Sequence, residues 1–138
     1  MGCRVARTLG QLGEIAGGAT PSTKKPSYWN GDIPWLSPKD LTNYAFRYIG
    51  HGERSITRSG YDNSSTVLLP AGTVLFSSRA PIGYVAIASN PVCTNQGFKS
   101  VVPYDGTDSL FLYYLLKFNR VRIEGLGSGT TFKEVSAT

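Results

Sequence analysis

The chain has 138 residues, 41% of them hydrophobic and 17% charged, which is typical of one folded domain and excludes a disordered segment. Fourteen basic residues against nine acidic ones give a net charge of +5, which is compatible with a polyanionic partner. No run of about 18 apolar residues predicts a membrane span, and the N-terminus lacks the apolar core of a signal peptide. We therefore expect a cytoplasmic domain over residues 1–138, with residues 1–7 forming a loose N-terminus.

The first half of the chain predicts short elements. Thr8 and Gln11 have capping-box spacing, which predicts one helical turn. Residues 17–35 are rich in glycine and proline and predict a loop that ends in a short strand at 33–36. Ser37, followed by proline, predicts a further helical turn. A strand at 46–49 and a short helix capped by Thr57 should follow.

The second half predicts most of the sheet. We expect strands at 67–69 and 73–77 joined by a tight turn, and further strands at 84–88 and 98–102. Asp108 should cap the longest helix, with Phe111, Leu112, Leu115, Leu116 and Ile123 on one side. The predicted fold is a single α+β domain with a mostly antiparallel twisted sheet, short helices and one longer C-terminal helix. Five aromatic residues are expected in its core: Trp35, Phe76, Phe98, Phe111 and Phe118.

No enzyme site is predicted. The single histidine, His51, stands between two glycines without a nucleophile or carboxylate placed near it by any motif. Cys3 and Cys93 match no metal spacing and are expected as reduced thiols, with a disulfide between them as the alternative. The glycine-rich segment at 125–133 lacks the Gly-Lys-Ser/Thr ending of a phosphate loop. We expect no catalytic residue, no metal and no cofactor, although a nucleotide-binding hydrolase that uses this segment stays an alternative.

The polar turns between the later strands carry cationic and amide side chains, and no Asp or Glu occurs from Asn63 to Tyr104. Arg79 can pair bidentately with guanine or with a phosphate, and the amides of Asn95 and Gln96 can pair with adenine. The alternatives are a salt bridge from Arg79 to a distant carboxylate, and ordinary turn chemistry for the two amides. Carboxylate-free turns of this kind suit a surface that meets DNA phosphates and base edges.

Other cationic, hydroxyl and aromatic side chains in predicted loops are candidates for contacts with the DNA backbone. Trp29 is expected to turn inward and anchor its loop, and the lysines beside it could equally be solvated charges. The full set of predicted DNA-binding residues is Lys24, Lys25, Tyr28, Lys39, Arg54, Arg58, Ser78, Arg79, Asn95, Gln96, Lys99, Thr130, Thr131 and Lys133.

Several blocks, in this order, resemble a target recognition domain of a type I restriction–modification specificity subunit. They are GATP at 18–21, IPWL at 33–36, LPAGT at 69–73, IG at 82–83, NQGF at 95–98 and GTT at 129–131. The resemblance covers nearly the whole chain. It implies a non-catalytic module that reads half of a bipartite site in double-stranded DNA.

The resemblance also implies partners. Methylation subunits would use S-adenosylmethionine to methylate adenine, and a restriction subunit would hydrolyse ATP. The family continues into a long spacer helix where this sequence ends, so we expect the chain by itself to be monomeric. A protein-interaction module of such a complex, or a recognition domain of another restriction–modification class, stays an alternative.

Overall fold

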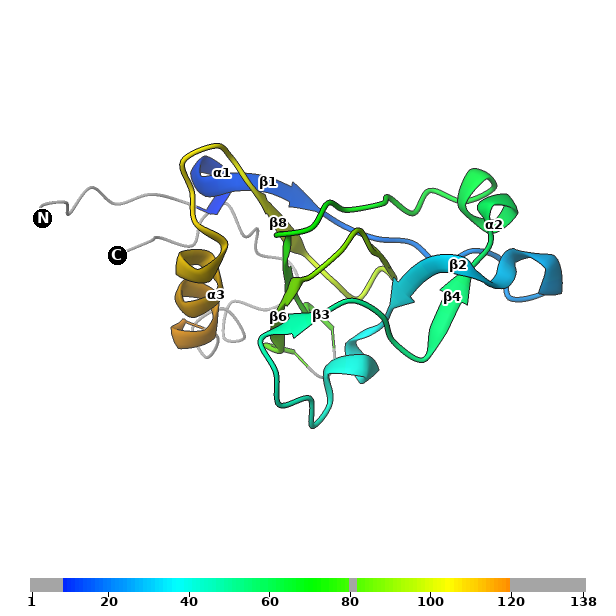
Figure 1. Cartoon of the computed structure of the whole chain (residues 1–138), viewed down its shortest axis with the longest axis horizontal. Coiled ribbons are helices and arrows are strands. Elements are labelled where there is room, and N and C mark those ends of the chain that lie inside the picture. Colours follow the sequence, from blue (N-terminus) through cyan, green and yellow to red (C-terminus); the bar gives the residue numbers. More distant parts are fainter. Residues whose placement is uncertain (1–8, 80–81, 120–138) are drawn as a thin grey trace, which may run out of the picture.

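The computed structural model describes residues 9–79 and 82–119, and its longer sheet has five strands (Figure 1). In spatial order these are β1 (Gly13–Ala16), β8 (Ser100–Pro103), β5 (Val74–Phe76), β6 (Val85–Ala88) and β3 (Tyr48–Ile49). The first three pairings are antiparallel, and β3 joins β6 in parallel. The predicted strands at 46–49 and 98–102 are thus shorter or shifted, because residues 46–47 lie outside the ladder and Phe98 makes only an isolated bridge with Ser77.

The main core lies between this sheet and α3 (Ser109–Phe118). Asp108 caps α3 as predicted, since its Oδ1 accepts a hydrogen bond from the Leu110 backbone N–H at 3.3 Å. The helix buries Leu112 and Leu116 completely against the side chains of β5, β6 and β8. Burial of each such leucine contributes about 1.5–3 kcal/mol. This helix therefore fixes one end of the molecule (Figure 1).

A separate three-stranded sheet lies toward the other end, where Figure 1 shows α2 (Arg58–Asp62) beyond β2 and β4. Its strands, in order, are β4 (Arg54–Ile56), β2 (Trp29–Leu36) and β7 (Cys93–Thr94). β2 is antiparallel to β4 and parallel to β7. The register of β2 shifts between Trp29 and Ile33, and Asn30 there has a φ of 64°, a conformation that asparagine tolerates. The α+β class is confirmed, and the sheet is divided in two.

Short helices link these strands. The predicted turns appear as α1 (Leu9–Leu12), η2 (Pro38–Leu41) and α2, and η1 (Pro26–Tyr28) precedes β2. Asp40 secures η2, because its carboxylate accepts hydrogen bonds from the backbone N–H groups of Ser37 (2.9 Å) and Glu53 (3.0 Å). The Thr57 hydroxyl accepts one from the Gly60 N–H at 3.1 Å and so caps α2 as predicted. Among the described residues, no helix is long and apolar enough to cross a bilayer.

Two predictions about the core are wrong. Phe111 and Phe118 are 48% and 80% exposed, because α3 turns Leu112, Tyr113 and Leu116 inward instead. Almost every position of this helix is apolar, so periodicity did not identify its buried face.

The prediction of a strand at 67–69 is also wrong. Val67 and Leu68 are exposed, and Leu69 alone forms a bridge, with Val92 rather than with the strand after the turn. The turn itself exists, with Gly72 at a φ of 92°. In contrast, Trp29 is buried as expected, and its indole N–H donates to the Ser22 carbonyl at 3.0 Å.

Candidate nucleic-acid interface

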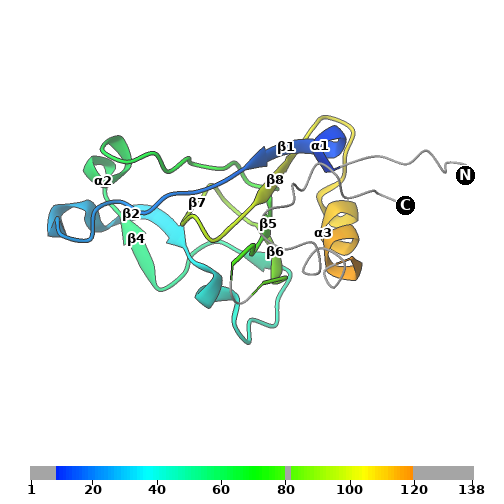
Figure 2. The ribbon, with the colours of Figure 1, turned by 180° about the vertical axis from the view of Figure 1, so that it is seen from behind.

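Four loops that are distant in the sequence meet where β2 and β7 end. Figure 2 shows these strands side by side. We call the surface formed by residues 18–20, 37–39, 78–79 and 95–97 the loop junction. Three backbone hydrogen bonds join its loops to their neighbours: Asn95 N to Leu36 O (2.9 Å), Ala19 N to Thr94 O (3.0 Å) and Ser78 N to Gly97 O (2.8 Å).

Two glycines allow the loops to approach this closely. A Cβ on Gly18 would lie 2.2 Å from the Asn95 carbonyl oxygen and 2.3 Å from that of Thr94. A Cβ on Gly97 would lie 2.8 Å from the Pro38 ring. Any larger residue at position 18 would meet backbone, which cannot move aside as a flexible side chain can. Glycine at these positions therefore maintains the contact between the loops.

The amide side chains of Asn95 and Gln96 differ in how many of their hydrogen-bonding groups are available to a ligand. The Asn95 Oδ1 accepts a hydrogen bond from the Gly97 N–H at 2.8 Å, so its carbonyl serves the turn, as the alternative interpretation stated. Gln96 is exposed, and its Oε1 accepts a hydrogen bond from the Thr20 hydroxyl at 2.5 Å. An amide oxygen has a second lone pair and the amide nitrogen has two N–H donors. Gln96 can therefore still offer a donor and an acceptor to a base edge while Thr20 fixes its orientation.

Arg79 is exposed and directly follows Ser78 in the junction. The turn behind it closes on Ser77, whose carbonyl accepts from the Gly83 N–H (3.0 Å) and whose hydroxyl accepts from the Tyr84 N–H (2.8 Å). Gly83 has a φ of 94°, which explains the glycine. No ion pair among the described residues includes Arg79, so the alternative of a salt bridge to a distant carboxylate finds no support there.

Two predicted lysines lie next to this surface. Lys39 follows Pro38 in η2, and its Nζ lies 3.7 Å from the Glu53 carboxylate, with both side chains more than two-thirds exposed. An exposed pair of this kind is worth at most about 1 kcal/mol, so the lysine can exchange Glu53 for a phosphate. Lys99 is exposed where the 95–97 turn leads into β8.

A second group of predicted residues lies around α2 and η1, on the three-stranded sheet. Lys24 and Lys25 are exposed in the loop before η1, and Tyr28 is half-buried at its end. The guanidinium of Arg54 lies 3.8 Å from the centre of the Trp29 ring. Arg58 donates to Asp62 at 3.1 Å. These residues form a cationic rim on the three-stranded sheet, and several of them already have partners within the protein.

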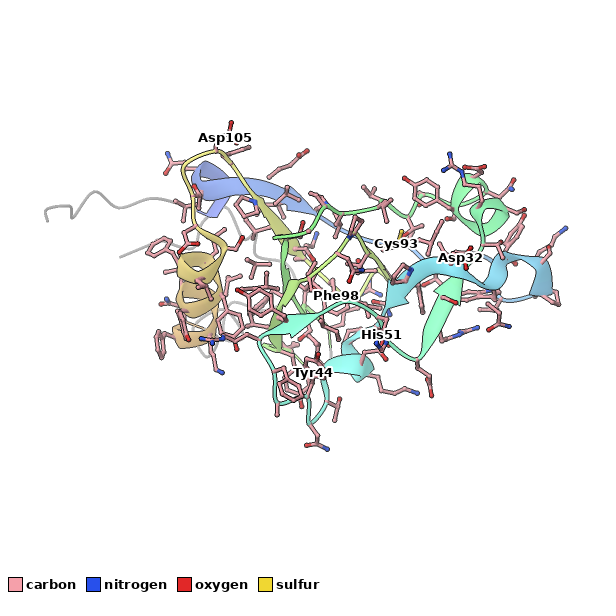
Figure 3. The ribbon with its side chains drawn as sticks, in the orientation of Figure 1. Asp32, Tyr44, His51, Cys93, Phe98 and Asp105 are labelled. Carbon is pink, nitrogen blue, oxygen red and sulfur yellow. The ribbon has the colours of Figure 1, made fainter. Side chains whose placement is uncertain are left out.

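The remaining predicted residues, Thr130, Thr131 and Lys133, lie outside the described residues, as do Cys3, Pro81 and Ile123. His51 is exposed, whereas Cys93 and Phe98 lie inside the fold (Figure 3). Burial raises the pKa of the Cys93 thiol to about 11, so the thiol is protonated at neutral pH. Cys93 is free, as predicted. Within the described parts of the chain, no three His, Cys, Asp or Glu residues come together as metal ligands.

The prediction missed Thr20, the residue that orients Gln96. A signal for it was present, because Thr20 lies in the GATP block at 18–21, one of the blocks that carry the family resemblance. What the sequence did not reveal is that this loop crosses the turn at 95–97, since the crossing depends on tertiary backbone contacts.

Comparisons with known proteins agree with the family resemblance described for the sequence. The chain is 49% identical over 134 residues to the type I restriction enzyme MjaIX specificity subunit of Methanocaldococcus jannaschii, covering 96% of this chain and 31% of that protein. It is 34% identical over 115 residues to the EcoR124I/EcoR124II specificity subunit of Escherichia coli, covering 80% and 28%. The chain therefore spans about a third of the length of these relatives.

The fold is also similar to that of a solved structure, the HsdS subunit of Thermoanaerobacter tengcongensis. The TM-score is 0.75 at 19% identity, with 96% of this chain and 32% of that chain covered. The family model described as "Type I restriction modification DNA specificity domain" matches residues 5–138. Since this match covers nearly the whole sequence, the chain belongs to the family of type I restriction–modification DNA specificity domains.

Proposed function

We propose that the chain is a target recognition domain that reads one half of a bipartite site in double-stranded DNA. The observation that carries this proposal is the loop junction, where Arg79 and Gln96 are exposed on adjacent turns joined by the Ser78–Gly97 hydrogen bond. An arginine fork and an oriented amide are the two side-chain groups that best distinguish guanine and adenine in the major groove. Family membership and the names of the relatives support a role in DNA specificity.

The residues divide into two roles. Arg79 and Gln96 are proposed to contact base edges. The lysines and arginines beside the junction and on the rim around α2 are proposed to contact phosphates, which fix the position of a protein on the duplex without reading sequence. The turns that carry Arg79 and Gln96 lie in the carboxylate-free stretch between Asn63 and Tyr104, whereas Asp40 and Glu53 lie beside the 37–39 loop.

In this proposal the chain carries no catalytic step. Methylation and cleavage belong to partner methylation and restriction subunits in the cytoplasm, and the chain directs those subunits to the site. A lone domain should be monomeric and should bind weakly, because affinity for a bipartite site rises when two recognition domains are linked.

The test is a binding selection on randomised duplex DNA with the chain fused to a dimerising helix. Enrichment of a short defined motif is expected. The affinity should also fall as the salt concentration rises, and each phosphate contacted should add about 0.9 to the steepness of the plot of log affinity against log salt concentration. A flat sequence profile, or binding that is independent of salt, would contradict the proposal.

Substitution of Arg79 separates the two roles. Arg79→Ala should weaken binding to the selected motif by about 1–3 kcal/mol and relax the preference at one base position. Arg79→Lys should recover little of the affinity that Arg79→Ala loses, because lysine lacks the bidentate guanidinium of arginine. Lys99→Ala is the control and should weaken binding to all sequences alike. If Arg79→Ala does the same, Arg79 contacts a phosphate and not a base.

A further inference from the structure

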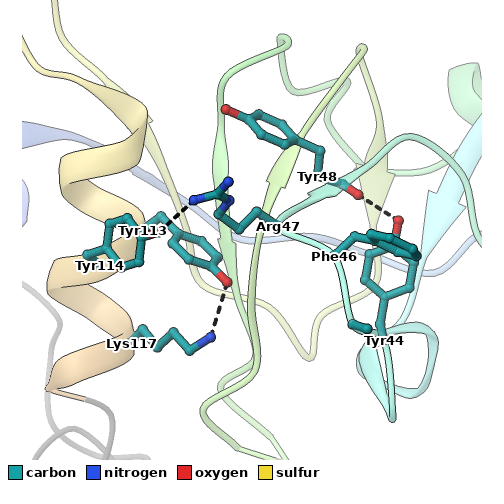
Figure 4. A pocket seen from close by; sticks show the side chains of 8 residues that line it. Tyr44, Phe46, Arg47, Tyr48, Tyr113, Tyr114 and Lys117 are labelled. Atoms are coloured by element: carbon teal, nitrogen blue, oxygen red, sulfur yellow. Dashed lines mark hydrogen bonds between the residues drawn. The ribbon is translucent and has the colours of Figure 1, made fainter.

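A groove between the loop before β3 and α3 lies outside the loop junction. It encloses about 690 Å³ and is lined by residues 44–48 on one side and by Tyr113, Tyr114 and Lys117 on the other (Figure 4). Among the described residues, none that is proposed to contact DNA lines it. Residues 44–48, its first wall, fall between the short sequence blocks that carry the resemblance, although the family model spans them.

The walls of the groove carry aromatic rings that are open to solvent. Phe46 is 71% exposed and packs edge-on against Tyr44, with ring centroids 5.6 Å apart. Next to the groove on α3, Phe118 does not line it but is 80% exposed and stacks on the wall residue Tyr114 at 5.9 Å. Exposed phenylalanines are uncommon on a free surface, and aromatic residues are enriched where proteins bind one another. These exposed rings therefore form an apolar surface that a binding partner could cover.

Three of the four tyrosine hydroxyls that line the groove have partners within the protein. The Tyr44 hydroxyl donates to the Tyr48 carbonyl at 2.6 Å. Arg47 Nη1 donates to the Tyr114 hydroxyl at 2.6 Å, and Lys117 Nζ donates to the Tyr113 hydroxyl at 3.3 Å (Figure 4). Of these bonds, only Arg47–Tyr114 links the two walls, and the ring faces remain open to a ligand.

Charge in the groove has one sign. Arg47 and Lys117 are both exposed, and no carboxylate of the described residues lines the groove. Each cation uses one donor on a tyrosine and retains others, because a guanidinium has five N–H donors and an ammonium has three. A ligand that fits must therefore bring negative charge together with apolar groups.

We propose that this groove binds a segment of a partner protein in which an apolar side chain is flanked by carboxylates. The carboxylates pair with Arg47 and Lys117, and the apolar side chain lies against Phe46 and the ring of Tyr114. Arginine and tyrosine at the centre of such a contact are the residue types that contribute most to protein association. The surface is additional to the DNA-reading loops and does not depend on them.

Duplex DNA fits this groove less well. In a duplex the base faces are stacked on one another, so exposed aromatic rings find only sugars and phosphates to contact. Single-stranded DNA can stack its bases on aromatic rings and is the competing ligand. Two cations suffice for a pair of carboxylates, whereas a strand that follows a groove requires a series of cations along its backbone.

The test uses the 138-residue chain and four fluorescein-labelled probes in anisotropy titrations. The first is a 15-residue peptide that alternates Asp or Glu with Leu or Phe. The second replaces its acids by lysine, the third replaces its apolar residues by serine, and the fourth is a 15-mer of deoxythymidylate. We expect the acidic apolar peptide to bind at least tenfold more tightly than each of the other three, and less tightly as salt rises.

Variants locate the binding. Phe46→Ser and Arg47→Gln should each weaken binding of the acidic apolar peptide several-fold. Both variants should leave the binding of duplex DNA at the loop junction unchanged. Phe111→Ser is the matched control, because Phe111 is also exposed on α3 but does not line the groove. Equal binding of the three peptides, tighter binding of the oligonucleotide, or a peptide affinity that Phe46→Ser leaves unchanged would each overturn the proposal.

Discussion

The α3 end of the molecule and the loop junction are held together in different ways. At the α3 end, stability comes from apolar side chains that are removed from water. Phe76, Leu112 and Leu116 are all fully buried there, and each is surrounded by other core residues. In such a core, a change of even one methylene in side-chain volume affects stability, so these side chains cannot vary freely.

At the loop junction, the main chain makes the contacts. Backbone hydrogen bonds and the closely packed Gly18 and Gly97 set the positions of the loops, and the side chains of Arg79 and Gln96 are exposed, with Gln96 bonded only to the exposed Thr20. Their identity can therefore change while the loops stay in place. Under the proposed function, this separates the side chains that read DNA from the backbone contacts that hold the loops.

Removal of a core side chain should have the largest effect on stability. Leu112→Ala removes a fully buried side chain, and we expect unfolding free energy to fall by about 2–5 kcal/mol, measured by urea denaturation. Phe111→Ala, one residue earlier, is the control and should cost less than about 1 kcal/mol, because that ring is 48% exposed. Equal losses for the two variants would mean that the buried face of α3 is wrongly identified.

The same helix shows what the sequence could and could not predict. Its start was predictable, because an aspartate followed by a long apolar run is a strong N-cap signal, and Asp108 does cap it. Its buried face was not, since apolar residues occupy nearly the whole circumference. Of the exposed aromatic rings of α3, Tyr114 lines the groove, whereas Phe111 and Phe118 do not, so apolar residues of this helix lie at exposed as well as buried positions.

The candidate site was predictable in its chemistry but not in its assembly. Arg79 and Gln96 were identified from carboxylate-free turns, and both are exposed on turns that are hydrogen-bonded to each other. The contact of Thr20 with Gln96 spans 76 residues and depends on a backbone crossing at Gly18. The partner of Leu69 escaped prediction for the same reason, because it pairs with the distant Val92 and not with the strand after the turn.

A methyl group at the crossing should have an intermediate effect, on both stability and binding. Gly18→Ala would place a Cβ 2.2–2.3 Å from two backbone carbonyl oxygens, so the loop at 18–20 must move away from the 95–97 turn. Strain of this kind costs about 1–3 kcal/mol of unfolding free energy. Affinity for the selected DNA motif should fall as well, because the displaced loop no longer orients Gln96.

Gly17→Ala provides a close control for that substitution. A Cβ at position 17 would have nothing within 4 Å, so this variant should keep the stability and DNA affinity of the parent chain. If both alanine variants bind DNA as well as the parent does, the position of the 18–20 loop does not matter for recognition. The conclusion that backbone contacts position the recognition side chains at the junction would then be wrong.

The smallest expected effect comes from the hydroxyl that orients Gln96. Thr20→Val keeps the shape of the side chain and removes its hydrogen bond to Gln96 Oε1, which should weaken cognate binding by about 0.5–1.5 kcal/mol and leave stability unchanged. Thr23→Val, another exposed threonine of the same loop, should change neither quantity. In a Gln96→Ala background the Thr20 effect should vanish, because the hydroxyl acts only through that amide. A Thr20→Val loss that persists in this background would instead show that Thr20 contacts the DNA itself.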